Sequence, residues 1–284
     1  MITTAPAPSR ISVAAHVDEP DARFRDLLGA EWIKLWSLRS TYASLSLIIV
    51  SAIGFCVYAS LADYRNWPSY GADRRSFFDP IRDAFPQQAY LFVLLAASSV
   101  GATAVASEYA TGLIRTSLAA VPDRRALIAA KIMVVAGVMT IVGAIAAGSA
   151  FAISQAILSG RGAGWSITHP YALRATAASA LIVPVVSVVG MGIGALVRNT
   201  AATIVTTTAV LLLMPFMVGT NRHWEAVLNH SLPVMAWERL IELPQFARFD
   251  GPYPASVTGA WIVFGAWPLV AAAVALIAVR RRDV

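Results

Sequence analysis

The sequence predicts an all-α integral membrane protein with six transmembrane helices. Of its 284 residues, 57% are hydrophobic and 13% are charged, whereas about 25% are charged in soluble domains. Six stretches are apolar and long enough to cross about 30 Å of hydrocarbon. Their cores contain no acidic or basic side chain, apart from Arg174 at one edge. Lipid is therefore the expected solvent for most of the chain.

Composition also excludes several other classes of protein. The single cysteine, Cys56, excludes an intrachain disulfide framework and a multi-cysteine metal site. The basic residues cluster beside apolar segments instead of forming one stripe, so nucleic acid is not an expected partner. Residues 1–20 are rich in Pro, Ala and Ser and lack the apolar region of a signal peptide. They are expected to form a disordered cytoplasmic tail.

Residues 21–41 are predicted to form an amphipathic interfacial helix. Apolar side chains recur there at helical spacing, at Phe24, Leu27, Leu28, Trp32, Leu35 and Trp36. Tryptophans flanked by Lys34 and Arg39 suit a helix that lies among lipid headgroups. A soluble helix that packs on the bundle would show the same pattern.

Residues 42–284 are predicted to form the transmembrane domain. The expected spans are 42–61, 86–106, 132–158, 173–197, 201–219 and 256–279. Thirteen of the 22 Lys and Arg residues fall on the side of the two termini, including the run at 280–282, and nine fall on the opposite side. The positive-inside rule therefore predicts that both termini are cytoplasmic.

Two features of spans four and five suit close helix packing. Only residues 198–200 separate these spans, which predicts a tight hairpin. Gly190 and Gly194 form a GxxxG face on span four. Pro184 and Pro215 are expected to bend spans four and five, respectively.

The segment 220–255 is long and semi-apolar. It is predicted to form one or two short helices that re-enter the membrane or lie on the outer leaflet, interrupted at Pro233 and Pro244.

The segment 107–131 (SEYATGLIRTSLAAVPDRRALIAAK) is too polar for lipid, although it lies between two apolar spans. Leu113 and Leu118 give a short predicted helix an apolar side, while Arg115 remains exposed. Pro122 ends this helix, and Asp123 can cap the next one. Such a helix could act as a lever for a soluble motor protein, although an ordinary positive-inside loop is the alternative.

No catalytic motif occurs in the sequence. It contains no HExxH, no GxSxG and no nucleotide-binding loop, because Lys34 and Lys131 are not followed by Ser or Thr. His223 and His230 suit an interfacial helix face better than a metal site. The chain is thus expected to be no enzyme, and to bind neither a cofactor nor a metal.

Two stretches resemble the membrane subunits of bacterial ABC-type exporters, the type-2 ABC transporter permease family. They are AEWIKLWSLRSTYASL at 30–45 and the segment 107–131. The matching positions are Glu31, Lys34, Arg39, Glu108, Gly112, Pro122, Arg124, Arg125 and Lys131. The resemblance implies a multi-pass permease in the bacterial cytoplasmic membrane, with a cytoplasmic coupling helix between spans two and three.

The resemblance also implies partners. A separate ABC ATPase, expected in two copies, would carry ATP and Mg, and a second permease copy or a sister permease would complete the assembly in membrane lipid. The expected ATPase-coupling residues are Glu108, Gly112, Leu113, Arg115, Leu118, Pro122, Arg124 and Arg125. The expected interfacial-helix residues are Glu31, Trp32, Lys34, Trp36 and Arg39.

The expected function is ATP-driven efflux of an amphipathic or lipid-like substrate such as a drug, an antibiotic or a lipid. An ion-coupled secondary transporter is one alternative, although such proteins usually need a carboxylate or a broken helix near the membrane midplane. A non-catalytic membrane scaffold is the other. The sequence offers no substrate-binding residue.

Overall fold

A computed structural model describes residues 23–110, 123–244 and 252–281, and these residues form helices and connecting loops without any strand. Six helical segments among them are long and apolar enough to cross a membrane. They are α2 (Arg39–Asn66), α5 (Gln87–Ala110), α7 (Arg124–Ser159), α8 (Pro170–Val197), the segment Thr200–Met217, and α13 (Val257–Arg281). The predicted all-helical membrane fold with six spans is confirmed.

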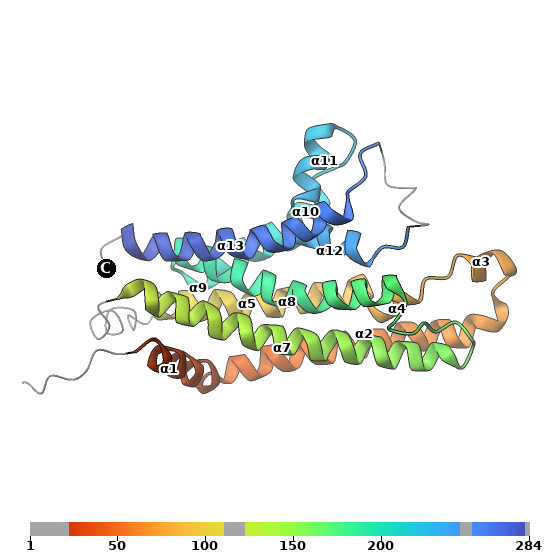
Figure 1. Ribbon diagram of the computed structural model, residues 1–284, viewed down its shortest axis with the longest axis horizontal. Helices are drawn as coiled ribbons and strands as arrows, with labels where there is room; N and C mark the ends of the chain where they lie inside the picture. Colours follow the sequence, from red (N-terminus) through yellow and green to blue (C-terminus); the bar gives the residue numbers. More distant parts are fainter. Residues whose placement is uncertain (1–22, 111–122, 245–251, 282–284) are drawn as a thin grey trace, which may run out of the picture.

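The long helices run side by side along the long axis of the molecule (Figure 1). The helix α1 (Phe24–Ser37), the start of α7 and the end of α13 lie at one end of the bundle. The short helices α3 (Ala72–Ser76) and α4 (Pro80–Ala84) lie at the opposite end. We call these the α1 end and the α4 end.

The helix α8 lies at the centre of the bundle, where it packs against α5, α7 and α13. Its contact with α5 depends on small residues from both helices. A Cβ atom on Gly101 would lie 1.7 Å from the carbonyl oxygen of Ser187, and one on Gly190 would lie 2.4 Å from that of Ser98. Gly194 faces the same neighbour, so the glycine face of span four contacts α5 of the same chain.

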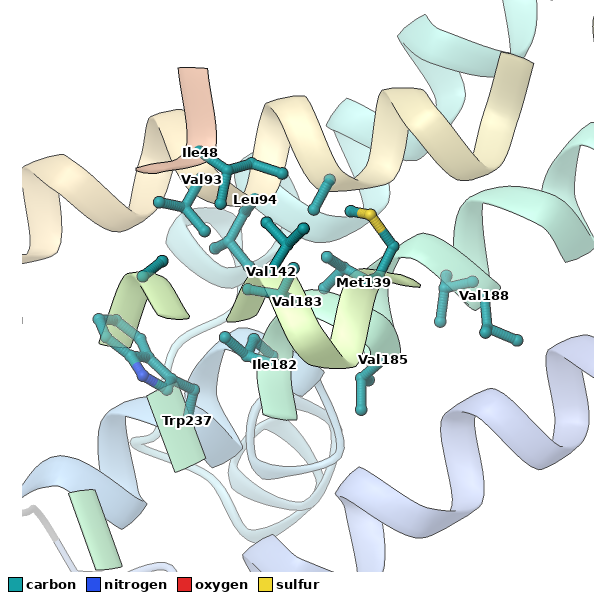
Figure 2. Close-up of a cluster of buried hydrophobic side chains, with 14 of the residues drawn as sticks. Ile48, Val93, Leu94, Met139, Val142, Ile182, Val183, Val185, Val188 and Trp237 are labelled. Atoms are coloured by element: carbon teal, nitrogen blue, oxygen red, sulfur yellow. The ribbon is translucent and has the colours of Figure 1, made fainter. Parts of the chain in front are cut away.

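The core is built mainly from aliphatic side chains, and all six spans contribute to it. Ile48 from α2, Val93 from α5, Met139 from α7 and Ile182 from α8 belong to one buried cluster (Figure 2). The outward faces are apolar as well, and exposed large hydrophobic side chains include Tyr58, Val205 and Leu269. A helix that is apolar all round is typical of a bundle whose solvent is lipid.

The fifth span is interrupted. It begins with α9 (Thr200–Thr208), continues as the π-helical turn η2 (Ala209–Leu213) and ends with α10 (Met214–Met217). The π turn ends two residues before Pro215, which lacks the N–H that an α-helix would use there. By contrast, α8 continues as one helix through Pro184.

Two short helices follow the fifth span. The helix α11 (His223–His230) projects away from the bundle, and α12 (Pro233–Ile241) returns to it (Figure 1). Proline at the start of α12 is favourable because the first helical residue needs no N–H partner. Trp237 on α12 is 1% exposed, stacks on Tyr90 with ring centroids 4.3 Å apart, and donates its indole N–H to Ser179 Oγ at 3.0 Å.

Arg174 on α8 fixes the end of α12. Its guanidinium donates to two backbone carbonyls, those of Leu240 at 2.8 Å and Glu242 at 2.5 Å. These carbonyls lack helical partners because α12 ends at Ile241. Arg174 therefore stabilises the docked position of α12.

Candidate functional site

Four charged side chains from three helices meet at the α1 end. Glu31 and Lys34 come from α1, Glu108 comes from the last turn of α5, and Lys131 comes from the second turn of α7. We call these four residues the charge cluster. Its two acids and two bases balance, so the cluster as a whole carries no net charge.

Each carboxylate in the charge cluster contacts both ammonium groups. Glu108 Oε1 accepts from Lys131 Nζ at 2.9 Å and from Lys34 Nζ at 3.1 Å. Glu31 accepts from Lys34 through Oε1 at 2.8 Å and from Lys131 through Oε2. The four side chains therefore form a closed ring of charge-assisted hydrogen bonds.

Burial makes this ring costly to break. Glu31 is 3% exposed, Lys131 is 4% exposed and Glu108 is 6% exposed. Removing one partner of a buried ion pair typically destabilises a protein by about 3–5 kcal/mol, because the remaining charge stays buried without compensation. Lys34 differs, since 41% of its side chain is exposed.

Electrostatics keep Lys34 charged. Burial by itself lowers the pKa of Lys34, but the hydrogen bonds and the charges of Glu31 and Glu108 outweigh it, so the pKa is raised above its usual value. A cavity of about 120 Å³ lies beside the cluster, lined partly by Ser37, Ser107 and Val134. Glu108 Oε2 is buried without a hydrogen-bond partner among the described residues.

The charge cluster holds both borders of the segment 107–131. Glu108 lies at the end of α5, and Lys131 lies just after the start of α7, which Asp123 caps by accepting from the backbone N–H groups of Arg125 and Ala126. Glu31 connects both helices to α1. These contacts connect the end of α5 and the start of α7 to α1.

The charge cluster lies in the part of the chain that matches a known protein family. The family model described as "ABC-2 family transporter protein" matches residues 27–219, which include all four residues of the charge cluster. The chain belongs to the ABC-2 transporter family. A comparison with curated proteins gave no match. As an ABC-2 family member, the chain is a multi-pass membrane protein with the role of an ABC transporter permease.

Much of the expected coupling interface of this ABC-2 permease lies outside the described residues. This applies to Gly112, Leu113, Arg115, Leu118 and Pro122. Arg124 and Arg125 occupy the first turn of α7, where Arg124 is half-buried and Arg125 is exposed. Of the interface residues that are described, Glu108 is thus the buried anchor and Arg125 is the one that faces solvent.

The helix that was predicted to lie among the lipid headgroups is α1. Its buried side chains are Leu27, Glu31 and Leu35, which pack toward the bundle. Trp32 is exposed and contacts Trp36 edge to face, with ring centroids 5.6 Å apart. The helix therefore has one face on the bundle and one face carrying an exposed tryptophan.

Arg39 has a different position from the other expected residues of the interfacial helix. It is the first residue of α2 and is exposed, one residue beyond the break at Leu38 that separates α1 from α2. It takes no part in the charge cluster. Its place suits a cation at the membrane surface.

One pair at the α1 end was not singled out from the sequence. Arg198, in the turn between α8 and α9, lies with its guanidinium carbon 4.8 Å from the ring centre of Tyr109 on α5. Arg198 has a positive φ of 59°, which permits the tight turn between these helices. Two features of the sequence could have indicated this pair. Tyr109 directly follows Glu108, and Arg198 is a cation within the three-residue connection between spans four and five.

Proposed function

We propose that this permease is the transmembrane subunit of an ATP-driven exporter in the bacterial cytoplasmic membrane. A separately encoded ATPase would bind ATP and Mg and would contact the segment 107–131. The match to the ABC-2 transporter family supports the permease role. The observation that supports coupling through this segment is the charge cluster, which joins α5, α7 and α1 at its two borders.

The proposed coupling step is mechanical. A soluble ATPase that moves the segment would pull on the end of α5 and the start of α7. Because Glu108 and Lys131 are bonded directly and are also connected through Lys34 and Glu31, the helices would move together. Buried ionic networks with discrete arrangements are suited to transmit displacement between packed helices.

The proposed substrate is amphipathic or lipid-like, such as a drug, an antibiotic or a lipid. Among the described residues, the buried charged side chains lie at the two ends of the bundle: Glu31, Glu108 and Lys131 at one end, and Asp79 and Asp83 at the other. The middle of the spans is therefore apolar, which suits a substrate with a large hydrophobic part. An ion-coupled mechanism would favour a carboxylate near the midplane.

The proposed orientation places the α1 end in the cytoplasm. Arg39, Arg124 and Arg125 lie at that end, and the basic residues at 280–282 follow in sequence. The complete transporter would contain two ATPase subunits and a second permease, either a further copy or a sister chain. Membrane lipid would surround the apolar outward faces and the exposed side of α1.

Cysteine labelling tests the orientation. In a Cys56→Ala background, Ser69→Cys at the α4 end should react with an impermeant thiol reagent added to intact cells. Asp123→Cys, which is also exposed in the structure, should react only after the membrane is opened. Labelling of position 123 in intact cells would contradict the proposed orientation.

Reconstitution tests the function. The purified permease should hydrolyse no ATP above background, and it should form a complex with its ATPase. Proteoliposomes that contain both chains should move a hydrophobic fluorescent probe only when ATP is supplied. Transport driven by an ion gradient without ATP would support the secondary transporter instead.

A further inference from the structure

At the α4 end, two carboxyl groups from different helices contact each other. Asp63 lies near the end of α2, and Asp83 lies on the short helix α4, which packs against α2 and α7. Their side chains lie within hydrogen-bonding reach of one another, on two helices that pack together. Two ionised carboxylates cannot form such a bond, because neither has a hydrogen to donate. A hydrogen bond between these two groups therefore requires a proton on one of them.

The surroundings place this proton on Asp83. Asp83 is 7% exposed, and its Oδ2 atom has no donor among the described residues. Burial, followed by the charge and hydrogen bond of Asp63 and the charge of Asp79, raises the pKa of Asp83 to about 8. Asp63 in turn accepts a hydrogen bond from the Tyr70 hydroxyl.

The other charged groups near this pair are already engaged. Asp79 accepts from the backbone N–H of Ile81 at 2.9 Å and lies 3.7 Å from the guanidinium of Arg82. Arg74 on α3 contacts the Tyr70 hydroxyl at 3.3 Å. Glu242, beyond the end of α12, raises the pKa of Asp79 in addition to the larger effect of burial.

From α7, the polar groups next to this site are uncharged. Gln155 donates its side-chain amide to the Pro80 carbonyl at 3.0 Å, and Ser154 accepts from Ser60 on α2 at 2.8 Å. These bonds hold the start of α4 and the end of α2 against α7. These bonds do not depend on pH. The Asp63–Asp83 contact joins α2 to α4 directly, and it differs from them because it involves a proton.

This link borders a cavity whose wall includes several charged and polar side chains. The cavity has a volume of about 450 Å³ and lies between α2, α4 and α5 on one side and α12 on the other. Its wall includes Ala59, one turn before Asp63 on α2, together with Asp83. Trp237 and Glu238 line it from α12. A separation of α4 from α2 would therefore widen the cavity at Ala59.

We propose that Asp63 and Asp83 form a proton-binding site that holds α4 against α2, and that loss of the proton separates the two helices and opens the adjoining cavity. After deprotonation, two buried like charges would lie in contact, which strongly disfavours the closed arrangement. The proposal does not depend on ATPase coupling. Its assignment to the outer face rests on the proposed orientation.

Thiol labelling of Ala59→Cys tests the proposal, using purified protein with Cys56→Ala and Ser69→Cys as an exposed reference. From about pH 7 to about pH 9 the labelling rate, relative to the reference, should rise about tenfold, since the ionised fraction of a group with a pKa of about 8 rises from roughly one tenth to roughly nine tenths over this range. In Asp83→Asn, whose amide can donate to Asp63 at every pH, the relative rate should stay flat. Asp63→Asn should give the same flat profile if the first variant does not fold.

Asp79→Asn is the matched control. Asparagine can still cap α4, and the Asp63–Asp83 pair is left intact, so the rise should persist. A flat profile for the unsubstituted pair would overturn the proposal. So would a rise that survives in Asp83→Asn, or one that disappears in Asp79→Asn, since the proton would then be bound elsewhere. Transport measurements take no part in these outcomes, so the proposed exporter function stands or fails separately.

Discussion

Lys131 on α7 donates a hydrogen bond of 2.9 Å to Glu108 on α5, and both side chains are almost completely buried. The two residues lie on either side of the segment that the permease is proposed to present to its ATPase. Glu31 from α1 completes the contact by accepting from Lys131. This arrangement gives the polar segment between spans two and three a rigid base.

The charge cluster predicts unequal effects for its two lysines. Lys131→Met should lower the free energy of unfolding by about 3–5 kcal/mol, because it removes the buried one of the two cations that Glu31 and Glu108 share. Lys34→Met should cost only about 0–1 kcal/mol, since water reaches the remaining groups at that side. Thermal unfolding in detergent, followed by fluorescence size exclusion, measures the difference. Equal losses would show that burial does not decide the energetics of the cluster.

The close contact between α5 and α8 predicts that position 101 requires glycine. Gly101→Ala would place a methyl group against the Ser187 carbonyl of α8, so the helices must move apart, and we expect a loss of about 1–3 kcal/mol or more. Gly137→Ala on α7 is the matched control, because nothing lies within 4 Å of its added Cβ. The control should leave the melting temperature unchanged or raise it slightly. Similar melting temperatures for the two variants would argue against this close packing.

The docking of α12 predicts a graded series at Trp237. Trp237→Phe keeps the stacking on Tyr90 but loses the hydrogen bond to Ser179, at a cost of about 1 kcal/mol. Trp237→Ala also leaves a cavity and should cost about 3–5 kcal/mol. Limited proteolysis of the segment 220–255 measures the release of α12. Equal cleavage of both variants and the unsubstituted protein would contradict the docked position.

The buried carboxyl of Asp83 predicts a pH-dependent stability. Its pKa in the folded protein is about 8, above its ordinary value of 3.8, so the folded state binds the proton more tightly. The resulting stabilisation is complete below the ordinary value, declines as pH rises and is lost above about pH 8. Asp83→Asn cannot ionise. It should therefore melt at a higher temperature than the unsubstituted protein near pH 8.5, and the difference should shrink toward pH 5.

Asp73→Asn provides the control for this pH profile. Asp73 lies on α3 in the same connection between spans, but it is exposed. Its replacement should leave the melting profile parallel to that of the unsubstituted protein. A pH-independent difference for Asp83→Asn would show that Asp83 is ionised in the folded state.

The six spans could be predicted because their signal is local. Runs of about 20 apolar residues need no knowledge of tertiary contacts. The two short helices after the fifth span were also predictable, since Pro233 marks the start of α12. The π-helical turn before Pro215 was not, because proline indicates an interruption of the helix without specifying its geometry.

The charge cluster could not be predicted from spacing. Three of its four bonds connect residues 23, 74 and 100 positions apart, and such pairs depend on how the helices pack. The sequence did contain one overlooked signal. Glu31 lies four residues after Leu27 and four before Leu35, on the face of α1 that proves to be buried. A charge within an apolar stripe indicates a buried partner.

The proposed role of the segment 107–131 predicts a separate effect on ATPase binding. Leu118→Asp introduces a charge at an expected apolar contact and should reduce copurification of the ATPase. Arg124→Glu with Arg125→Glu should weaken binding as well, because like charges at an interface can cost several kcal/mol. Membrane topology must be verified for that pair, since it alters the positive-inside signal. Wild-type copurification and transport by Leu118→Asp would indicate that the segment is only a loop.

The most direct test of coupling through the charge cluster is the amount of substrate moved per ATP hydrolysed in proteoliposomes. Glu108→Ala should still assemble with the ATPase, because the buried Glu108 anchors the segment instead of contacting the partner. We expect this variant to hydrolyse ATP at a rate similar to that of the unsubstituted complex while transport per ATP falls about tenfold or more. Lys34→Met is the matched variant and should retain most of its transport. Unchanged transport per ATP in Glu108→Ala would contradict the account.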